Sequence, residues 1–402
     1  MIGMDELVEG QHLDMNVGDS YSLFYGNSEE YWWDEKYEWS SSNPTVAMVY
    51  YSQLFAMQGG ETTVTLRGEG EEISFTISVP ETPHGDIYFT CRGEDHGHSE
   101  EMGDYIVSYT DRLIVNGIMT DELCNILASD GQGNLWKGYY SDEAVSLSVN
   151  GKPIVDSHEF PVTYFGRHNF RARKDKLYLI PGVNMGNEFR YAAISTDGTW
   201  KETTVGNQDL EETWGQTIGV ADIDEGPDGN IVLWGYASSF RLYMWNMSPE
   251  GTLSGHVPWY NQDDRYLFGS AALDSEGNDY ELMYFSELIY ICKNGKPIWK
   301  LSGVERPKLI VHDNDFYVAC LSPEEDGRWD SDLELYLIKN GDPVLLDSHL
   351  PCGSDLDFCI SRTGVPYIIT GAAGGFSVYK EGTRILFFPY INCYEPMLAV
   401  VD

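Results

Sequence analysis

The sequence predicts an all-β protein, because one short pattern recurs seven times after residue 110. In each copy a β-rich run is followed by a tight turn at a glycine and then by another apolar run. The glycines are Gly117, Gly151, Gly198, Gly251, Gly295, Gly341 and Gly382. Four of the turns read Asn-Gly, which supplies the positive φ angles of a two-residue type I′ turn, so the pattern predicts a series of β-hairpins. Their spacing of roughly 34 to 53 residues is typical of four-stranded propeller blades.

Residues 1–80 have a different pattern and predict a separate unit. Alternating apolar and polar residues at 21–25, 63–66 and 73–79 predict short strands, and the turn-rich spacers between them are typical of a small β-sandwich. Pro80 and Pro83 cannot continue a hydrogen-bonded ladder, so residues 81–85 are expected to form a short, stiff linker.

Two segments of this first unit are similar to a known family. The first segment is Trp39-Ser-Ser-Ser-Asn-Pro-Thr-Val-Ala, and the second is Gly59-Gly-Glu-Thr-Thr-Val-Thr-Leu. In this order the two segments resemble the pattern of the bacterial Ig-like group 2 (BIG2) domain, and the resemblance covers residues 5–79. The sequence departs from the family at Tyr50-Tyr-Ser-Gln-Leu-Phe-Ala-Met, where an Asp/Asn-Gly turn is usual. The resemblance implies an Ig-like fold, a role as spacer or adhesion module, and a secreted or surface-attached bacterial protein.

A second hairpin precedes most of the glycine turns, and together the two hairpins make a four-stranded unit. These inner hairpins are predicted at residues 126–136, 220–234, 271–280, 309–318 and 358–369, with a degenerate copy at 170–180. Two hairpins per repeat predict four antiparallel strands, which is one propeller blade. The repeats also resemble those of secreted bacterial propellers with Asp-x-x-Gly-Asn-aromatic turns, a pattern that many unrelated activities share.

The two ends of the larger unit are each expected to supply half of an inner hairpin. Residues 396–402 read as an innermost strand without a partner, and residues 86–91 read as a second strand without a first. Pairing them would complete a blade and remove a free sheet edge. The sequence therefore predicts an N-terminal Ig-like sandwich at 1–80 and a seven-bladed propeller at 86–402 that is closed by its own terminal strands.

Composition narrows the possible partners and the compartment. The chain has 64 acidic and 25 basic residues, and its formal charge of −39 would repel nucleic acid and anionic lipid. No apolar run is long enough to span a membrane. The first residues lack the features of a signal peptide, so for a secreted protein we expect the signal to lie outside this sequence. Seven cysteines without a Cys-x-x-Cys pair predict buried thiols rather than a zinc site or a disulfide framework.

Candidate ligand-binding residues gather in the connections that are expected on one face of the propeller. The tight turns of both hairpins lie on one rim, so the longer connections lie on the other, around the mouth of the central channel. In these connections aromatic residues lie beside carboxylate and amide residues in the sequence. Aromatic rings can stack on the faces of sugars, and carboxylates and amides can form hydrogen bonds with sugar hydroxyl groups. The aromatic candidates are Tyr139, Tyr140, Trp214, Trp259, Tyr260 and Trp329.

Arg167, Arg265 and Arg306 enter the innermost strands at matching places. If they converge on the axis, they form a cationic funnel that binds a carboxylate or sulfate through a bidentate fork. The alternative is that each arginine forms an ion pair with one of the abundant acids. His96 and His98, with Glu94, bring only three potential ligands together, so we interpret that segment as a solvated acidic loop and expect no metal and no cofactor.

The sequence leaves three functional hypotheses. The first is a secreted or cell-surface protein whose propeller loops bind a carbohydrate or a peptide, with other surface proteins as further partners. The second is a polysaccharide lyase or glycoside hydrolase, which would need two carboxyl groups about 5 to 10 Å apart beside the sugar. The third is a scaffold for protein contacts, which predicts a broad exposed apolar patch. No nucleophile elbow, metalloprotease motif or phosphate loop is present.

Overall fold

The fold was analysed in a computed structural model. The structure describes residues 9–23, 37–50, 53–68, 71–92, 94–99, 103–108, 111–141, 144–160, 170–180, 188–206, 218–237, 242–248, 253–258, 267–285, 288–323, 332–372, 375–389 and 393–402. All regular structure in these residues is β-strand, as the sequence predicts. The same residues include no helix long and apolar enough to cross a bilayer.

Two sheets at the N-terminus share one apolar core. The first sheet has the order β1 (His12–Asp14), β7 (Glu71–Val79), β6 (Gly60–Gly68) and β3 (Tyr37–Ser41), and the second has the order β2 (Ser20–Ser22), β5 (Gln53–Ala56) and β4 (Ala47–Tyr50). Leu54 from the second sheet and Phe75 from the first lie in the same buried cluster, and Trp39 packs edge-to-face on Phe75. The hairpin that departs from the family pattern does form, with Tyr50 opposite Gln53.

Seven further four-stranded sheets follow, numbered here sheets 1 to 7. Sheet 1 contains β12 (Ile118–Leu123), β11 (Arg112–Val115), β8 (Asp86–Arg92) and β37 (Tyr394–Val401), and sheet 2 contains β13 (Ile126–Ser129), β14 (Leu135–Ser141), β15 (Ala144–Val149) and β16 (Lys152–Glu159). Sheet 3 contains β17 (Phe170–Arg173), β18 (Lys176–Leu179), β19 (Glu188–Ser195) and β20 (Trp200–Gly206). Sheet 4 contains β21 (Ile218–Glu225), β22 (Ile231–Ala237), β23 (Leu242–Met247) and β24 (Leu253–Pro258).

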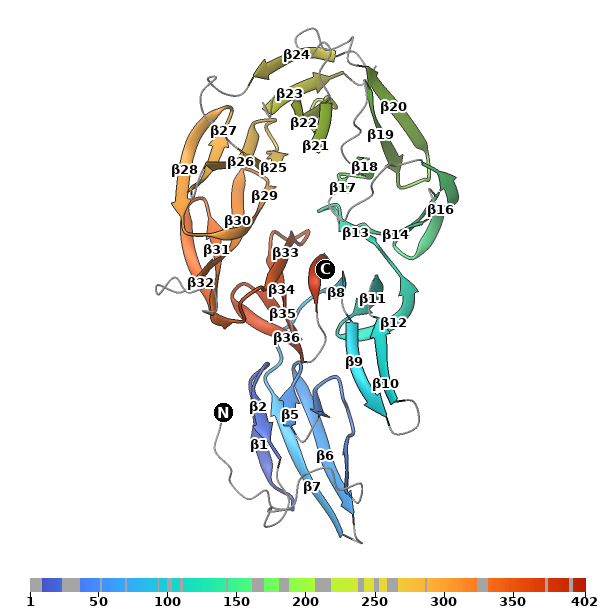
Figure 1. The fold of residues 1–402 in the computed structure, drawn as a ribbon, viewed down its shortest axis with the longest axis vertical. Helices are drawn as coiled ribbons and strands as arrows, with labels where there is room; N and C mark the ends of the chain where they lie inside the picture. The colour runs from blue at the N-terminus through green and yellow to red at the C-terminus, as the bar shows by residue number, and fades with distance from the viewer. Residues whose placement is uncertain are drawn as a thin grey trace.

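The remaining three sheets repeat the same order of strands. Sheet 5 contains β25 (Leu267–Leu273), β26 (Asp279–Phe285), β27 (Leu288–Lys293) and β28 (Lys296–Ser302). Sheet 6 contains β29 (Glu305–His312), β30 (Asp315–Pro323), β31 (Leu333–Lys339) and β32 (Asp342–Leu350), and sheet 7 contains β33 (Asp355–Ile360), β34 (Pro366–Ala372), β35 (Gly375–Lys380) and β36 (Thr383–Pro389). Figure 1 shows these sheets arranged around a common centre, as in a β-propeller, with β13, β17, β21, β25, β29 and β33 nearest to it.

The two ends of this larger part of the chain pair as the sequence predicts. Strand β37 runs antiparallel to β8, with Leu398 opposite Phe89 and Val400 opposite Ile87. One expectation was wrong, because residues 94–108 do not form only a loop. They contain a two-stranded hairpin, β9 (Glu94–Ser99) and β10 (Gly103–Ser108), inserted between β8 and β11. The side chains of His96 and His98 lie outside the described part.

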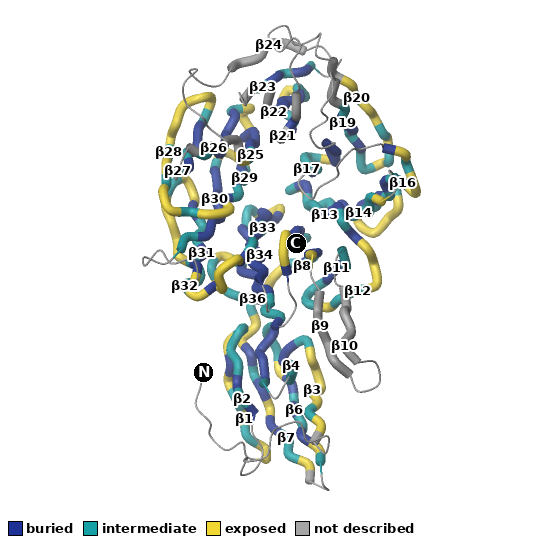
Figure 2. Tube along the Cα trace, viewed as in Figure 1, coloured by how far each residue is buried: buried dark blue, intermediate teal, exposed yellow. Residues whose placement is uncertain are grey.

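An apolar cluster lies between each sheet and the next, including the last and the first. Each cluster contains buried residues of both sheets, such as Leu113 and Leu127 (sheets 1 and 2), Trp136 and Leu177 (2 and 3), Tyr178 and Leu233 (3 and 4), Trp234 and Ala271 (4 and 5), Leu282 and Val318 (5 and 6), Leu335 and Phe358 (6 and 7) and Phe376 and Phe89 (7 and 1). Figure 2 shows the consequence, since middle strands such as β30 and β34 are buried and the outer strands such as β28 and β32 are largely exposed.

The N-terminal sheets are in direct contact with sheet 7. The backbone N–H of Phe387 donates to the carbonyl of Met57 over 2.8 Å, and the rings of Phe55 and Phe387 lie 6.2 Å apart. Lys380 donates to the carbonyl of Pro83 in the expected linker, where residues 81–85 form no strand. Backbone and aromatic contacts together therefore hold the N-terminal sheets against β36.

Candidate functional site

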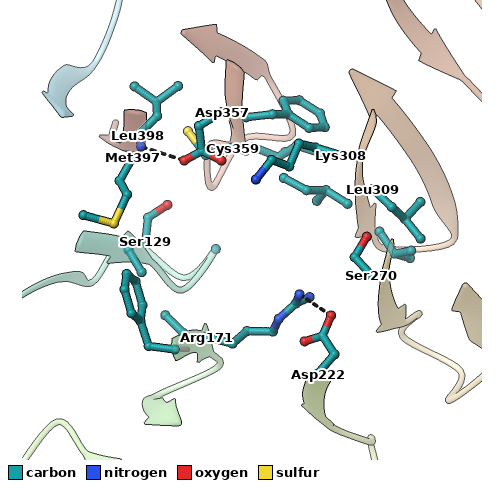
Figure 3. A pocket seen from close by; sticks show the side chains of 18 of the residues that line it. Ser129, Arg171, Asp222, Ser270, Lys308, Leu309, Asp357, Cys359, Met397 and Leu398 are labelled. Carbon is teal, nitrogen blue, oxygen red and sulfur yellow. Dashed lines mark hydrogen bonds and ion pairs between the residues drawn. The ribbon is translucent and has the colours of Figure 1, made fainter. Parts of the chain in front are cut away.

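A central cavity is the candidate site, because the innermost strand of each of the seven sheets lines it. Its volume is about 640 Å³, and its lining comes from β13, β17, β21, β25, β29, β33 and β37. Figure 3 shows Arg171, Asp222, Ser270, Lys308 and Asp357 around this space. Segments up to about 270 residues apart in the chain meet here, which only the ring-like order of the sheets allows.

Four aspartates on two inner strands connect each of these strands to the next sheet. Asp222 and Asp224 lie on β21, and their Oδ2 atoms accept the backbone N–H groups of Ala271 and Leu273 on β25, at 3.0 and 2.8 Å. Their Oδ1 atoms accept the N–H of the following residue in their own strand. We call residues with this pattern bridging aspartates.

The second pair of bridging aspartates repeats this arrangement between sheets 7 and 1. Asp355 and Asp357 lie on β33, and their Oδ2 atoms accept the backbone N–H groups of Glu395 and Leu398 over 2.9 and 2.8 Å. Because a carboxylate that accepts backbone N–H groups from two strands fixes their relative position, these residues set the register between neighbouring sheets.

A basic strand precedes each acidic strand around the cavity. Arg171 on β17 donates to Asp222 over 2.6 Å and to the carbonyl of Ala271 over 2.9 Å. Arg173 lies with Nε 2.9 Å from Asp224 Oδ1, an ion pair without the geometry of a hydrogen bond. On β29, Arg306 Nη1 lies 2.9 Å from Asp355 Oδ1.

Burial and ion pairing shift the pKa values of the buried carboxyl groups in opposite directions. Burial raises the pKa of Asp222, and the Arg171 guanidinium and two backbone N–H groups oppose the rise. Burial likewise raises the pKa of Asp357, opposed by the charge of Lys308 and by backbone N–H groups. The neighbouring cations therefore favour the charged form of these carboxyls, whereas burial disfavours it.

Three of the nine residues predicted from sequence lie in the described part of the chain. Arg306 lines the cavity and is paired with Asp355, as the ion-pair alternative predicts. Tyr139 and Tyr140 were expected in a loop, but they lie in β14, because they continue its ladder with Ser146 and Val145. Tyr140 packs against the cluster between sheets 2 and 3. Outside the described residues lie Arg167, Trp214, Trp259, Tyr260, Arg265 and Trp329.

The sequence prediction did not include Arg171, Arg173 and Asp222, which line the cavity. Arg171 and Arg173 alternate in the degenerate inner hairpin, and in the next inner hairpin Asp222 alternates with Asp224, the ion-pair partner of Arg173. Charged residues at alternate positions of a predicted innermost strand were the available signal, since such positions face the same side.

Comparison with known proteins gives only distant likenesses. No family model matches the chain, and no curated protein matches it. Among solved structures, a Lactobacillus plantarum protein is 14% identical with a TM-score of 0.44, covering 79% of this chain and 100% of its own. A quinonprotein alcohol dehydrogenase-like protein from Bacteroides thetaiotaomicron is 8% identical with a TM-score of 0.33, covering 98% and 97%. The β-propeller domain of the Trilobed protease from Pyrococcus furiosus is 10% identical with a TM-score of 0.38, covering 58% and 79%.

Proposed function

We propose that the protein is a secreted or cell-surface binding protein in which a closed seven-bladed propeller, residues 86–402, binds a carbohydrate at its central cavity. Closure is supported by the pairing of β37 with β8 and by an apolar cluster in each of the seven contacts between sheets. The ligand site in this proposal is the wall of the cavity, which β13, β17, β21, β25, β29, β33 and β37 line.

Residues 1–80 act in this proposal as an Ig-like module that carries the propeller. Support comes from two sheets around one core and from the Trp39 and Ser-Asn-Pro pattern of the BIG2 family. The hydrogen bond between Phe387 and Met57 fixes this module to sheet 7. A module joined in this way presents the cavity at a defined orientation to whatever surface bears the protein.

The cavity lining is the observation that carries the carbohydrate proposal. A volume of about 640 Å³ lies within the range of small-ligand sites, roughly 300 to 1,000 Å³. Its walls present ion-paired arginines and aspartates, whose remaining N–H groups and oxygen lone pairs can pair with hydroxyl groups. Hydroxyl-rich ligands match such a wall better than apolar ones, because desolvated polar groups need partners.

The same geometry argues against an enzyme that uses the cavity carboxyls. A glycosidase needs one carboxyl that donates a proton and a second that acts as base or nucleophile. Each of the four bridging aspartates already accepts the N–H of a neighbouring sheet. Protonating or moving one of them would therefore break a contact between sheets, so we assign them to the architecture.

A glycan array with the intact chain tests the proposal, with a peptide array as a second arm. We expect the intact chain to bind a carbohydrate. Ser129→Trp places an indole in the cavity and should abolish this binding. The exposed Ser302→Trp on β28 should leave it intact. Binding of peptides alone would contradict the carbohydrate proposal, and release of shorter products from a bound glycan would support the lyase or hydrolase alternative.

A further inference from the structure

Tyr394 is the only exposed aromatic side chain (Phe, Trp or Tyr) among the residues whose burial the structure describes. Its exposed fraction is 42%, whereas every other aromatic side chain in this set is buried or half-buried. Tyr394 begins β37, and Pro396, two residues further along the strand, lines the cavity. The exposed ring therefore belongs to the end of the cavity at which β37 begins.

An exposed ion pair lies beside this ring. Tyr394 is directly opposite Arg92 in the ladder between β37 and β8, and directly opposite residues project from the same face of a sheet. Arg92 Nη1 lies 3.1 Å from Glu395 Oε2. In a regular strand Glu395 would face away from Tyr394. The register shifts by one residue between Tyr394 and Met397, so a bulge brings the Glu395 carboxylate to the face that carries Arg92.

The backbone is strained at this bulge, and β29 repeats the same feature. Glu395 precedes Pro396 with a φ of 46°, and Arg306 precedes Pro307 with a φ of 49°. A left-handed backbone is unfavourable for residues other than glycine, and a residue before proline prefers an extended conformation. One carboxylate holds both bulges. Asp355 Oδ1 lies 2.9 Å from Arg306 Nη1, and its Oδ2 accepts the N–H of Glu395 over 2.9 Å.

Stability alone does not account for this arrangement. An exposed ion pair such as Arg92 with Glu395 adds little to the free energy of folding, so it does not offset a strained backbone. Strained residues that their surroundings hold in place are typical of sites that position side chains for a ligand. Each of the two arginines here, Arg92 and Arg306, faces one carboxylate. This end of the cavity therefore offers hydrogen-bond donors and acceptors without a net charge.

We propose that Tyr394 stacks on one ring of an uncharged glycan that extends into the cavity, and that Arg92 and Glu395 bind the hydroxyl groups of that ring. This inference rests on the carbohydrate proposal above and specifies its ligand class and its contact residues. The exposed phenol ring offers a flat apolar face to the C–H groups of a sugar, and the ion pair beside it supplies charge-assisted hydrogen bonds. An acidic sugar gains no unpaired cation here and is repelled by a chain whose net charge is −39.

Titration calorimetry on the intact chain tests the inference with the neutral trisaccharides of galactose, glucose and mannose and with the acidic trisaccharide of galacturonate. At least one neutral probe should bind, and more tightly than the acidic one. Tyr394→Ala should weaken this binding by about tenfold, because the stacking surface is lost, and Tyr394→Phe should keep most of it. Arg92→Met should also weaken it by about tenfold, through lost charge-assisted hydrogen bonds. The melting temperature should not change, because exposed ion pairs contribute little to stability.

Two matched controls should leave binding unchanged. Ile298→Ala on β28 removes a side chain of similar exposure, 47%, and Arg67→Met on β6 breaks another exposed ion pair of 3.1 Å. Binding of a neutral probe that neither Tyr394→Ala nor Arg92→Met weakens would overturn the inference while the carbohydrate proposal stands. Tighter binding of the galacturonate probe than of every neutral one would overturn the uncharged ligand class. Failure of every saccharide to bind would overturn both proposals. Should Tyr394→Ala not fold, Arg92→Met gives the same decision.

Discussion

Glu281 shows at the scale of one residue how sheet packing can change the chemistry of a side chain. It lies on β26 with no solvent exposure, beside Asp279 and near the indole of Trp234. Neither of its oxygens accepts a hydrogen bond of good geometry. Burial, reinforced by the charge of Asp279, raises the pKa of Glu281 from 4.5 to about 11. The side chain is therefore a neutral carboxylic acid at physiological pH.

This raised pKa predicts a pH-dependent stability. Because the folded-state pKa exceeds the unfolded value, the folded chain retains a proton that the unfolded chain releases. The contribution of this group to the stability is complete below pH 4.5 and is lost progressively as the pH rises towards 11. Glu281→Gln imitates the neutral acid, so its stability advantage over wild type should grow between pH 5 and pH 9 in denaturant titrations. Glu276→Gln in the nearby turn is the control, and a pH-independent advantage would contradict the assignment.

At the scale of elements, the outer hairpin turns are the best-predicted features of the protein. Asn294 and Gly295 have φ angles of 49° and 72°, as a type I′ turn requires, and Asn340 with Gly341 has 51° and 96°. The structure shows a second reason why asparagine occupies this position, in addition to the positive φ angle of the turn. Asn294 Oδ1 accepts the N–H of Asp279 at the start of the second strand, and Nδ2 donates to Asn278 in the inner turn.

The same connection recurs in three other sheets, and sheet 7 lacks it for a physical reason. Asn116, Asn150 and Asn340 accept the N–H groups of Ile87, Leu135 and Phe316 in the same way. In sheet 7 the equivalent turn residue is Glu381, whose N–H donates to Pro366. Since proline has no N–H to donate in return, an asparagine there would gain no bond.

Substitutions at these turns should separate the contribution of the backbone conformation to stability from the contribution of the asparagine hydrogen bonds. Asn294→Ala should cost about 2 to 3 kcal/mol in chemical denaturation, from two lost hydrogen bonds and a left-handed φ. Asn294→Gly keeps the φ angle and should cost only the hydrogen bonds, about 1 to 2 kcal/mol. Glu381→Gly, at a φ of 47°, should be neutral or stabilising because no such bond exists there. Equal effects of Asn294→Gly and Glu381→Gly on stability would contradict a contribution from the asparagine hydrogen bonds.

At the scale of the whole molecule, stability depends on the strand that the C-terminus contributes to sheet 1. Met397, Leu398 and Val400 are buried, and the N–H of Leu398 donates to Asp357 in sheet 7. Asp402 accepts a hydrogen bond from Thr363, also in sheet 7. The last strand therefore joins sheets 7 and 1 by apolar burial, by ladder pairing with β8 and by hydrogen bonds to a bridging aspartate.

Removing residues 396–402 should abolish cooperative unfolding or lower the melting temperature strongly. Three large buried side chains contribute roughly 1.5 to 3 kcal/mol each, against a total stability of about 5 to 15 kcal/mol. Leu398→Ala is a milder variant that should fold and lose about 2 to 5 kcal/mol in calorimetry. Leu345→Ala on the exposed strand β32 is the control. A truncated chain with an unchanged melting temperature would contradict the proposed closure.

The sequence by itself determined the strands, the hairpin turns and the pairing of the two ends, because these follow from alternation, positive φ and the need to satisfy sheet edges. It did not determine the cavity wall. Arg171 and Asp222 are 51 residues apart, and Asp357 reaches Leu398 across 41 residues. Such contacts depend on the register between sheets, which is set when their apolar faces pack together. Only the tertiary structure decided that residues of seven separate strands line one cavity.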